Sequence, residues 1–216
     1  MSETRIAVLV SGGGTNLQAL IDAQNAGRIK NGRIAAVISS KPGAYALERA
    51  AAAGIPGCVV ARRDYASNRE MTAALVDKLQ SLDIDLVVLA GFVHILTQEM
   101  VSAYPNAILN VHPALIPSFC GAGYYGLHVH EKALAYGVKL TGATVHFVNE
   151  EPDGGPIVLQ KAVDILEGDT PESLQRRVME QAEWVILPRA VSLFCEGRLS
   201  VEGRRVHIKE ADYENC

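Results

Sequence analysis

The sequence IAVLVSGGGTNLQALI, at residues 6–21, joins two kinds of periodicity across a run of glycines. Residues 6–10 are aliphatic and rich in β-branched side chains, which indicates a short buried strand. After the glycines, Leu17, Leu20 and Ile21 recur at helical spacing. A strand, a tight loop and a helix in this order are typical of the first unit of an α/β fold.

The same alternation continues along the amino-terminal half of the chain. Apolar runs predict strands at residues 34–38, 58–61 and 86–90, and helical periodicity predicts helices at residues 44–53 and 69–82. Strands that are apolar on both faces and alternate with helices favour a mostly parallel central sheet covered by helices on both faces.

The pattern changes after Phe92. The expected elements are a short helix at 98–103, a strand at 107–111, a long loop at 113–126, strands at 139–148 and 157–163, a long carboxy-terminal helix at 171–194 and a terminal hairpin at 199–208 that turns at Glu202-Gly203. Long loops in compact domains are usually functional or mobile, so residues 113–126 are of interest for function.

The composition limits the class of protein. With 216 residues and 49% apolar side chains, the chain can bury one sizeable core, and we expect a single domain over residues 1–216. The 20 basic and 24 acidic residues give a net charge of -4 without long runs of one sign, which argues against a nucleic-acid platform. Four dispersed cysteines and apolar runs too short to span a bilayer predict a cytoplasmic protein that does not bind a membrane.

The glycine loop Ser11-Gly12-Gly13-Gly14-Thr15-Asn16 lies between the first strand and the first helix. Backbone N–H groups and the helix dipole at such a position favour an anion, most simply a phosphate, although a sterically convenient turn is the alternative. A dinucleotide site is disfavoured because Leu17 stands where a third glycine is needed and no acidic residue ends the second strand. No Gly-Lys-Ser or Gly-Lys-Thr follows, so a P-loop is also disfavoured.

A second polar feature is the pair Asn110 and His112. The two-residue period of a strand places both on one face at its carboxyl end, where open α/β sheets bind ligands. An amide can polarise a carbonyl, and an imidazolium can stabilise an oxyanion or move a proton, so the pair suits acyl transfer. Asp153, in a turn rich in Gly and Pro, is the carboxylate expected to raise the pKa of His112.

Each of these three residues could also be an ordinary polar residue of a strand end or turn. The absence of a Gly-x-Ser-x-Gly motif disfavours a covalent acyl-enzyme and favours direct transfer between two bound substrates. His128 and His130 could suggest a metal, but two histidines without a third ligand are a weak signal. His146 could face the cleft or be a half-buried strand residue.

Several motifs together resemble the phosphoribosylglycinamide formyltransferases, folate-dependent enzymes of purine synthesis. They are SGGGTN at 11–16, LAGF at 89–92, LNVHP at 109–113, GATVHFV at 142–148 and DGGP at 153–156. The resemblance spans nearly the whole chain and implies a Rossmann-like formyltransferase fold. It also implies 10-formyltetrahydrofolate as co-substrate and glycinamide ribonucleotide as acceptor, with no metal.

The same resemblance implies roles for individual residues. Asn110, His112 and Asp153 would be catalytic, with Asp153 holding His112 protonated. The acceptor's phosphate and ribose would be bound by Gly14, Thr15, Asn16 and Glu183. The folate pocket would be formed by Arg69, Val93, His94, Ile95, Leu96, Asn149, Glu150, Glu151 and Pro152, together with Asn110 and Asp153. His94, Trp184 and the long segment from Cys120 to Tyr125 depart from the family pattern.

Other functions have weaker support. A formyltetrahydrofolate hydrolase would share the catalytic residues but usually has a further amino-terminal domain, which the sequence does not show. A methionyl-tRNA formyltransferase would be expected to carry a basic RNA-binding surface. A non-catalytic nucleotide-binding module would be expected to have lost one of the three catalytic residues, and a nicotinamide oxidoreductase lacks its cofactor motif.

Overall fold

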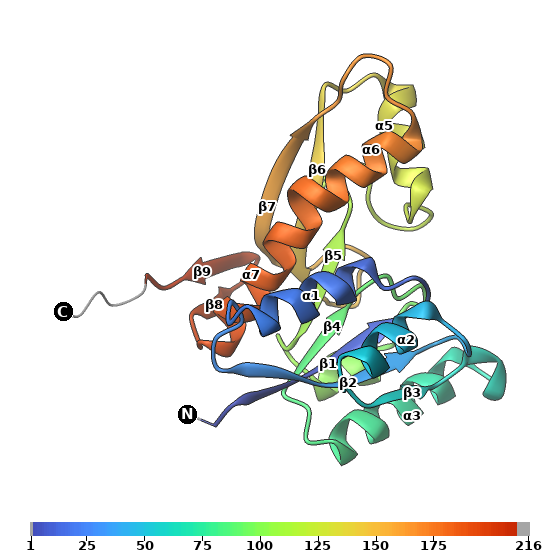
Figure 1. Cartoon of the computed structure of the whole chain (residues 1–216), viewed down its shortest axis with the longest axis vertical. Coiled ribbons are helices and arrows are strands. Elements are labelled where there is room, and N and C mark those ends of the chain that lie inside the picture. Colours follow the sequence, from blue (N-terminus) through green and yellow to red (C-terminus); the bar gives the residue numbers. More distant parts are fainter. Residues whose placement is uncertain (1, 211–216) are drawn as a thin grey trace.

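The computed structural model describes residues 2–210, which form a nine-stranded sheet with the strand order β3-β2-β1-β4-β5-β6-β7-β9-β8 (Figure 1). The strands are β1 Thr4–Val10, β2 Gly32–Ser39, β3 Gly57–Val59, β4 Leu86–Leu89, β5 Ile108–His112, β6 Leu140–Phe147, β7 Ile157–Asp164, β8 Leu199–Glu202 and β9 Arg205–Ile208. The helices are α1 Thr15–Asn25, α2 Tyr45–Ala52, α3 Asn68–Ser81, α4 Gln98–Ala103, α5 Leu127–Tyr136, α6 Pro171–Val178 and α7 Trp184–Cys195, with a short 3-10 helix at Arg62–Asp64.

Strands β1 to β5 are parallel to one another, and β6 and β7 continue the sheet in antiparallel pairing. The hairpin of β8 and β9 attaches at the edge through a parallel pairing of β9 with β7. The prediction of a mostly parallel sheet with a terminal hairpin is therefore confirmed.

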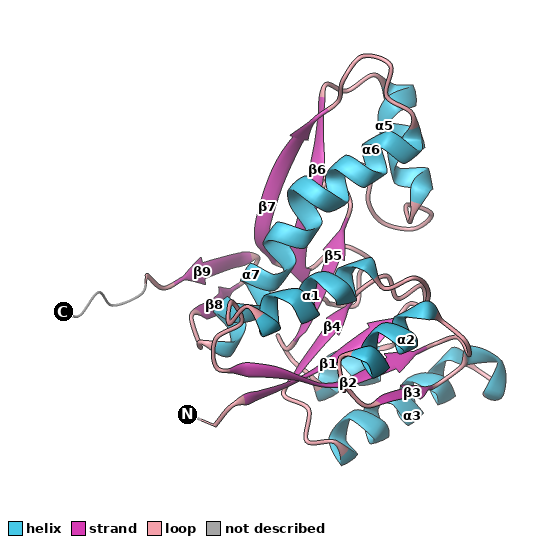
Figure 2. Cartoon of the chain, in the orientation of Figure 1, coloured by secondary structure: helices cyan, strands magenta, loops and turns pink. Residues whose placement is uncertain are grey.

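Helices cover both faces of the sheet, as the sequence predicts (Figure 2). Alternate residues of β1 enter different cores: Ile6 and Val8 pack with α1, α2, α6 and α7, whereas Ala7 and Leu9 pack with α3 and α4. Since both faces of the strand are buried, its sequence is a continuous apolar run. The loops that follow the carboxyl ends of the parallel strands form the site.

Two elements differ from the sequence-based expectation. The sequence pattern predicts no element at residues 127–136, which form α5; this helix begins after Gly126 and ends at Gly137 in a left-handed conformation. The long carboxy-terminal helix is continuous from Pro171 to Cys195, but Met179–Glu183 is a π-helix. π-Helical turns inside helices are frequent at functional sites.

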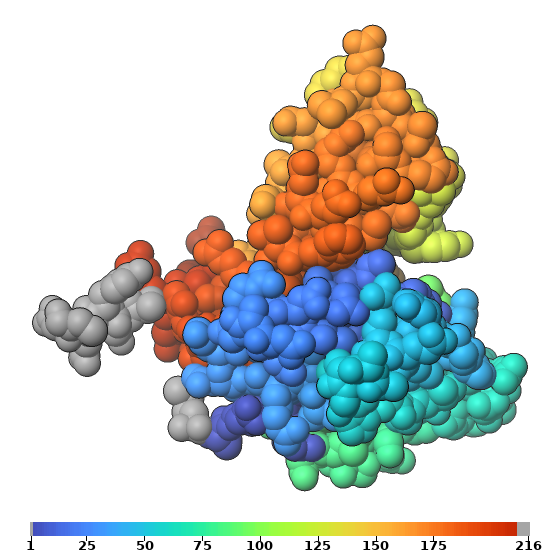
Figure 3. All heavy atoms as spheres, viewed as in Figure 1, coloured from blue at the N-terminus to red at the C-terminus, as the bar shows by residue number. Residues whose placement is uncertain are grey.

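Strands β6 and β7 extend beyond the parallel part of the sheet and form an arm together with α5 and α6, which projects from the body of the molecule (Figure 3). The loop of residues 113–126 connects β5 in the body to α5 in this arm. Among residues 2–210, no helix has the length and apolar character needed to cross a bilayer.

Candidate active site

The carboxyl end of β5 presents Asn110 and His112. The antiparallel pairing with β6 places Asn110 opposite His146, and the Asn110 side-chain nitrogen lies 3.2 Å from His146 Nε2. His146 Nδ1 lies 2.8 Å from the Phe147 carbonyl oxygen. Because a carbonyl can only accept, Nδ1 donates to it. His146, whose orientation the sequence left open, therefore belongs to the cluster.

Asp153 brings the two histidines together. Its backbone is in the left-handed region, with φ 55°, and this turn directs the carboxylate inward. One oxygen lies 3.4 Å from His112 Nδ1 and the other 3.6 Å from His146 Nε2. The Gly121 N–H donates to the same carboxylate at 2.8 Å. The three residues predicted to be catalytic thus lie in one cluster, linked through His146.

Both ring nitrogens of His112 face acceptors. Nδ1 faces Asp153, and Nε2 donates to the Phe119 carbonyl oxygen at 2.8 Å. Burial nevertheless lowers the pKa of His112 below its ordinary value, and the opposing effects of the Asp153 charge and the Phe119 carbonyl do not offset it. Asp153 does raise this pKa, as expected, but the expected net rise is wrong, because desolvation of a side chain that is only 4% exposed outweighs the carboxylate 3.4 Å away.

The pKa of Asp153 is below its usual value. Burial alone would raise it, but the contact with His146, the charge of His112 and the Gly121 N–H together outweigh burial. Asp153 is therefore ionised at neutral pH. A neutral His112 can donate to only one of its two acceptors, Asp153 or the Phe119 carbonyl, whereas an imidazolium donates to both.

The glycine loop lies between β1 and α1, with Gly14 as the N-cap of α1 at φ 73°. A side chain at Gly14 would be strained by this backbone and would also place its Cβ 2.6 Å from Ala46 Cβ. Among residues 2–210, the backbone N–H groups of residues 12–16 donate to no protein acceptor. Unpaired donors at a helix N-terminus are an arrangement that binds anions.

Asn16 joins this loop to the long carboxy-terminal helix. Its side-chain nitrogen donates to Glu183 Oε2 at 2.7 Å, across 167 residues of sequence, while its Oδ1 is buried without a partner among the described residues. Burial raises the pKa of Glu183 to about 7, and the hydrogen bond from Asn16 only partly offsets the effect. The π-helix ends at Glu183, so this irregular turn carries the residue to Asn16.

The segment predicted to bind the pterin follows β4. The Val93 N–H donates to Ser11 Oγ at 3.1 Å, which fixes this segment beside the glycine loop. Val93 and Ile95 are 58% and 64% exposed, whereas Leu96 is buried in the core beside α3 and α4. The ring of His94 packs edge-on against Phe92 at 5.5 Å between centroids.

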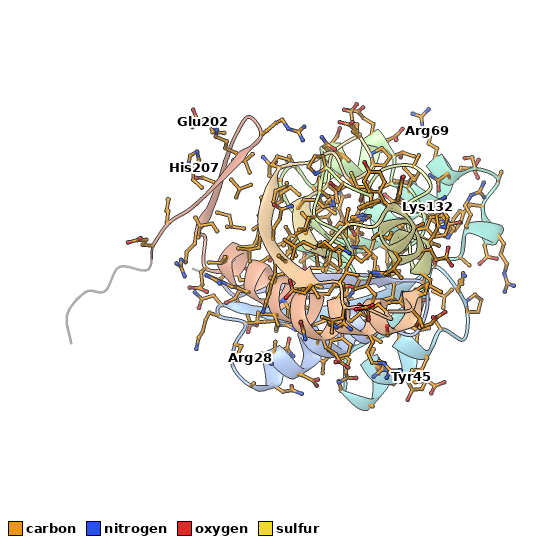
Figure 4. The ribbon with its side chains drawn as sticks, turned by 90° about the horizontal axis from the view of Figure 1, so that it is seen from above. Arg28, Tyr45, Arg69, Lys132, Glu202 and His207 are labelled. Carbon is orange, nitrogen blue, oxygen red and sulfur yellow. The ribbon has the colours of Figure 1, made fainter. Side chains whose placement is uncertain are left out.

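The other predicted folate residues lie in two places. Asn149, Glu150, Glu151 and Pro152 form the turn that precedes Asp153, where the Glu151 N–H donates to Asn149 Oδ1 at 3.1 Å. Arg69 on α3 points away from the body of the molecule, on the side opposite Tyr45 (Figure 4). It pairs with Glu99 at 2.6 Å and contacts none of the other predicted site residues through a hydrogen bond or an ion pair.

Comparison with known proteins shows the family of the chain. Residues 4–191 match the family model described as formyl transferase. The chain belongs to the formyl transferase family. It is 46% identical to the phosphoribosylglycinamide formyltransferase of Haemophilus influenzae, over 94% of this chain and 93% of that protein. It is 42% identical to the Escherichia coli enzyme of the same name, over 91% of this chain and 89% of that enzyme. The crystal structure of glycinamide ribonucleotide transformylase 1 from Symbiobacterium toebii superposes on this structure with a TM-score of 0.90 and 49% sequence identity. The match covers 96% of this chain and 94% of the chain in that crystal structure.

The three departures from the family pattern lie around the sites of this formyl transferase. His94 lies in the segment after β4. Trp184 follows Glu183, and its indole nitrogen is buried without a partner within residues 2–210. The long segment from Cys120 to Tyr125 includes the Gly121 N–H that contacts Asp153, so it adjoins the cluster of Asn110, His112 and Asp153.

The two histidines of α5 in this formyl transferase lie in different surroundings. His128 is exposed and lies 2.9 Å from Glu131, whereas His130 is fully buried with both ring nitrogens unpartnered in the described chain. Burial lowers the pKa of His130 to about 4. Within residues 2–210, no group of three or more His, Cys, Asp or Glu side chains is arranged to hold a metal ion.

Proposed function

We propose that the protein transfers the formyl group of 10-formyltetrahydrofolate to the amine of glycinamide ribonucleotide, a step of purine biosynthesis, in the cytoplasm. The observation that carries this proposal is the cluster of Asn110, His112 and Asp153 at the end of β5, in a chain of the formyl transferase family. The enzymes it matches over most of their length are named for this reaction.

The acceptor would bind between the glycine loop and the π-helix. The free N–H groups of Gly14, Thr15 and Asn16 are donors for its phosphate. Glu183 lies at the same end of α1, held there by Asn16, and would bind the ribose hydroxyls. With a pKa of about 7, this carboxyl group can accept or donate a hydrogen bond at neutral pH.

The folate would bind between the segment after β4 and the turn before Asp153. Exposed apolar side chains at Val93 and Ile95 offer contact area for a flat ring, and backbone groups from Val93 to Leu96 and Asn149 to Pro152 would read its polar edge. Arg69 would meet a carboxylate of the glutamate tail, for which it must exchange its present partner Glu99.

The transfer needs a proton to move in the opposite direction to the formyl group, from the amine of the acceptor to N10 of the folate. When the amine attacks the formyl carbon, the carbonyl electrons move to oxygen, and the Asn110 N–H not used by His146 stabilises the oxyanion. Neutral His112 accepts the proton lost by the amine and returns it to N10 of the folate as the carbon–nitrogen bond breaks. The ionised Asp153 stabilises the imidazolium between these two steps.

The loop of residues 113–126 must change its contacts during this cycle. The Phe119 carbonyl occupies His112 Nε2, the nitrogen that does not face Asp153. Substrates would therefore displace Phe119 to reach His112.

The test is to mix the protein with 10-formyltetrahydrofolate, with and without glycinamide ribonucleotide, and to follow the deformylated folate by absorbance. We expect turnover only with the ribonucleotide, and a loss of roughly 10²–10⁴-fold in Asp153→Asn, because the imidazolium loses its counter-charge. Glu167→Gln removes the charge of an exposed residue and serves as the matched control. Turnover without the ribonucleotide would make the protein a hydrolase, and no turnover with either mixture would refute the folate chemistry.

A further inference from the structure

The carbonyl groups of the three glycines in the glycine loop all have partners. The Gly12 oxygen accepts from the Ala46 N–H of α2 at 3.2 Å, and the Gly14 oxygen accepts from the Gln18 N–H of α1 at 2.9 Å. The Gly13 oxygen accepts from a side chain, Arg49 Nε, at 2.9 Å. Within residues 2–210 the N–H groups of residues 12–16 have no protein partner, so the carbonyl groups of the three glycines are occupied while the donors of the loop remain available.

Arg49 is itself held firmly in place. Its Nη1 donates to Gln18 Oε1 at 2.9 Å, and its guanidinium carbon lies 4.9 Å from the centre of the Tyr45 ring. The Cδ atom would lie 3.6 Å from a Cβ placed on Gly14, so the aliphatic stem packs against the loop as well. One half-buried side chain thus connects Gly13, the first turns of α1 and the exposed face of α2.

Two consequences follow for an anion bound to the loop. A carbonyl that is free to rotate can turn its oxygen toward the anion and repel it, and the bond from Arg49 prevents this at Gly13. The guanidinium also places a permanent positive charge next to the loop, where it lowers the energy of a bound phosphate.

We propose that Arg49 is a positioning residue for the phosphate of the acceptor. This inference rests on the proposed function for the identity of the acceptor. Arg49 orients the glycine loop so that the backbone donors of Gly12 to Asn16 point to the phosphate, and it does not touch the formyl group or the folate.

The experiment compares Arg49→Gln, Arg49→Lys and the wild type. In Arg49→Gln we expect the KM for the ribonucleotide to rise by about tenfold, the cost of a lost charge-assisted hydrogen bond, while kcat and the KM for the folate change little. Arg49→Lys keeps the charge but replaces the two fixed nitrogens that donate to Gly13 and Gln18 by a single ammonium on a flexible stem, so the KM of this variant is expected to lie between those of the wild type and Arg49→Gln. With the unphosphorylated acceptor, glycinamide riboside, all three proteins should have the same KM.

Arg28→Gln is the matched control, because Arg28 lines the same surface pocket of about 300 Å³ as Arg49 and has the same charge, but does not bond to the glycine loop. An equal rise of the KM in Arg28→Gln would mean that only bulk charge matters and would overturn the inference. An unchanged KM in Arg49→Gln, or a fall of kcat alone, would also overturn it.

A binding measurement separates this inference from the proposed function. Inorganic phosphate is titrated into each protein, and the backbone amide resonances of residues 12–16 are followed by NMR. We expect these resonances to shift at about tenfold lower phosphate concentration in the wild type than in Arg49→Gln. The measurement does not depend on turnover, and equal affinities for phosphate would refute the role of Arg49 even if formyl transfer is confirmed. If Arg49→Gln does not fold, Arg49→Lys gives the answer.

Discussion

Replacing Glu183 by glutamine is expected to stabilise the protein at alkaline pH and to weaken its binding of the ribonucleotide. The carboxyl group is 6% exposed, and burial raises its pKa from an ordinary 4.5 to about 7. A raised pKa in the folded state means that the free energy of unfolding is highest below the unfolded pKa and falls as the pH rises through the folded pKa. Glutamine cannot ionise, yet its amide oxygen can still accept the 2.7 Å hydrogen bond from Asn16.

The magnitude follows from the two pKa values. Between about pH 5 and about pH 8, the ionisation of Glu183 reduces the free energy of unfolding of the wild type by roughly 2.5 kcal/mol, at about 1.4 kcal/mol per unit of pKa. The free energy of unfolding of Glu183→Gln, relative to that of the wild type, should therefore be about 2.5 kcal/mol greater at the higher pH than at the lower pH.

Urea unfolding followed by the fluorescence of the single tryptophan, Trp184, measures this difference. Glu180→Gln, an exposed residue of the same π-helix, is the control and should show no such pH dependence. An equal change in unfolding free energy at the two pH values would refute the reasoning about Glu183. A KM for the ribonucleotide equal to that of the wild type would refute its contact with the ribose.

Two further changes test other parts of the structure. His130→Leu removes a buried imidazole whose pKa of about 4 lies below the unfolded value, so the free energy of unfolding of the wild type falls as the pH drops from about 6.5 to about 4. Between about pH 8 and about pH 5, urea unfolding should show a loss of free energy of unfolding that is roughly 2 kcal/mol smaller in the variant than in the wild type. Equal losses in the two proteins would contradict this. Gly155→Ala places a Cβ that overlaps the Phe147 carbonyl oxygen, so we expect a loss of roughly 1–3 kcal/mol and a raised KM for the folate as the turn before it shifts. A thermal midpoint and folate KM equal to those of the wild type would show that the turn accommodates the side chain.

The sequence was sufficient to predict the layered α/β architecture and the convergence of Asn110, His112 and Asp153. Both depend on local patterns: continuous apolar runs require strands buried on both faces, and the two-residue period of β5 places Asn110 and His112 on the same side. The same local reasoning missed α5, since residues 127–136 follow a glycine-rich loop and their helix is stabilised by packing of Val129, His130 and Ala133 in the arm.

Contacts between distant residues were determined only by the tertiary structure. The hydrogen bond of Asn16 to Glu183, the bond of Arg49 to Gly13 and the contact of Phe119 with His112 have no signal in the spacing of these residues. The tertiary structure also determined the direction in which the pKa of His112 shifts. A carboxylate beside a histidine predicts a raised pKa, but the pKa of His112 is lowered because the fold removes its side chain from water, and burial is a property of the packed molecule.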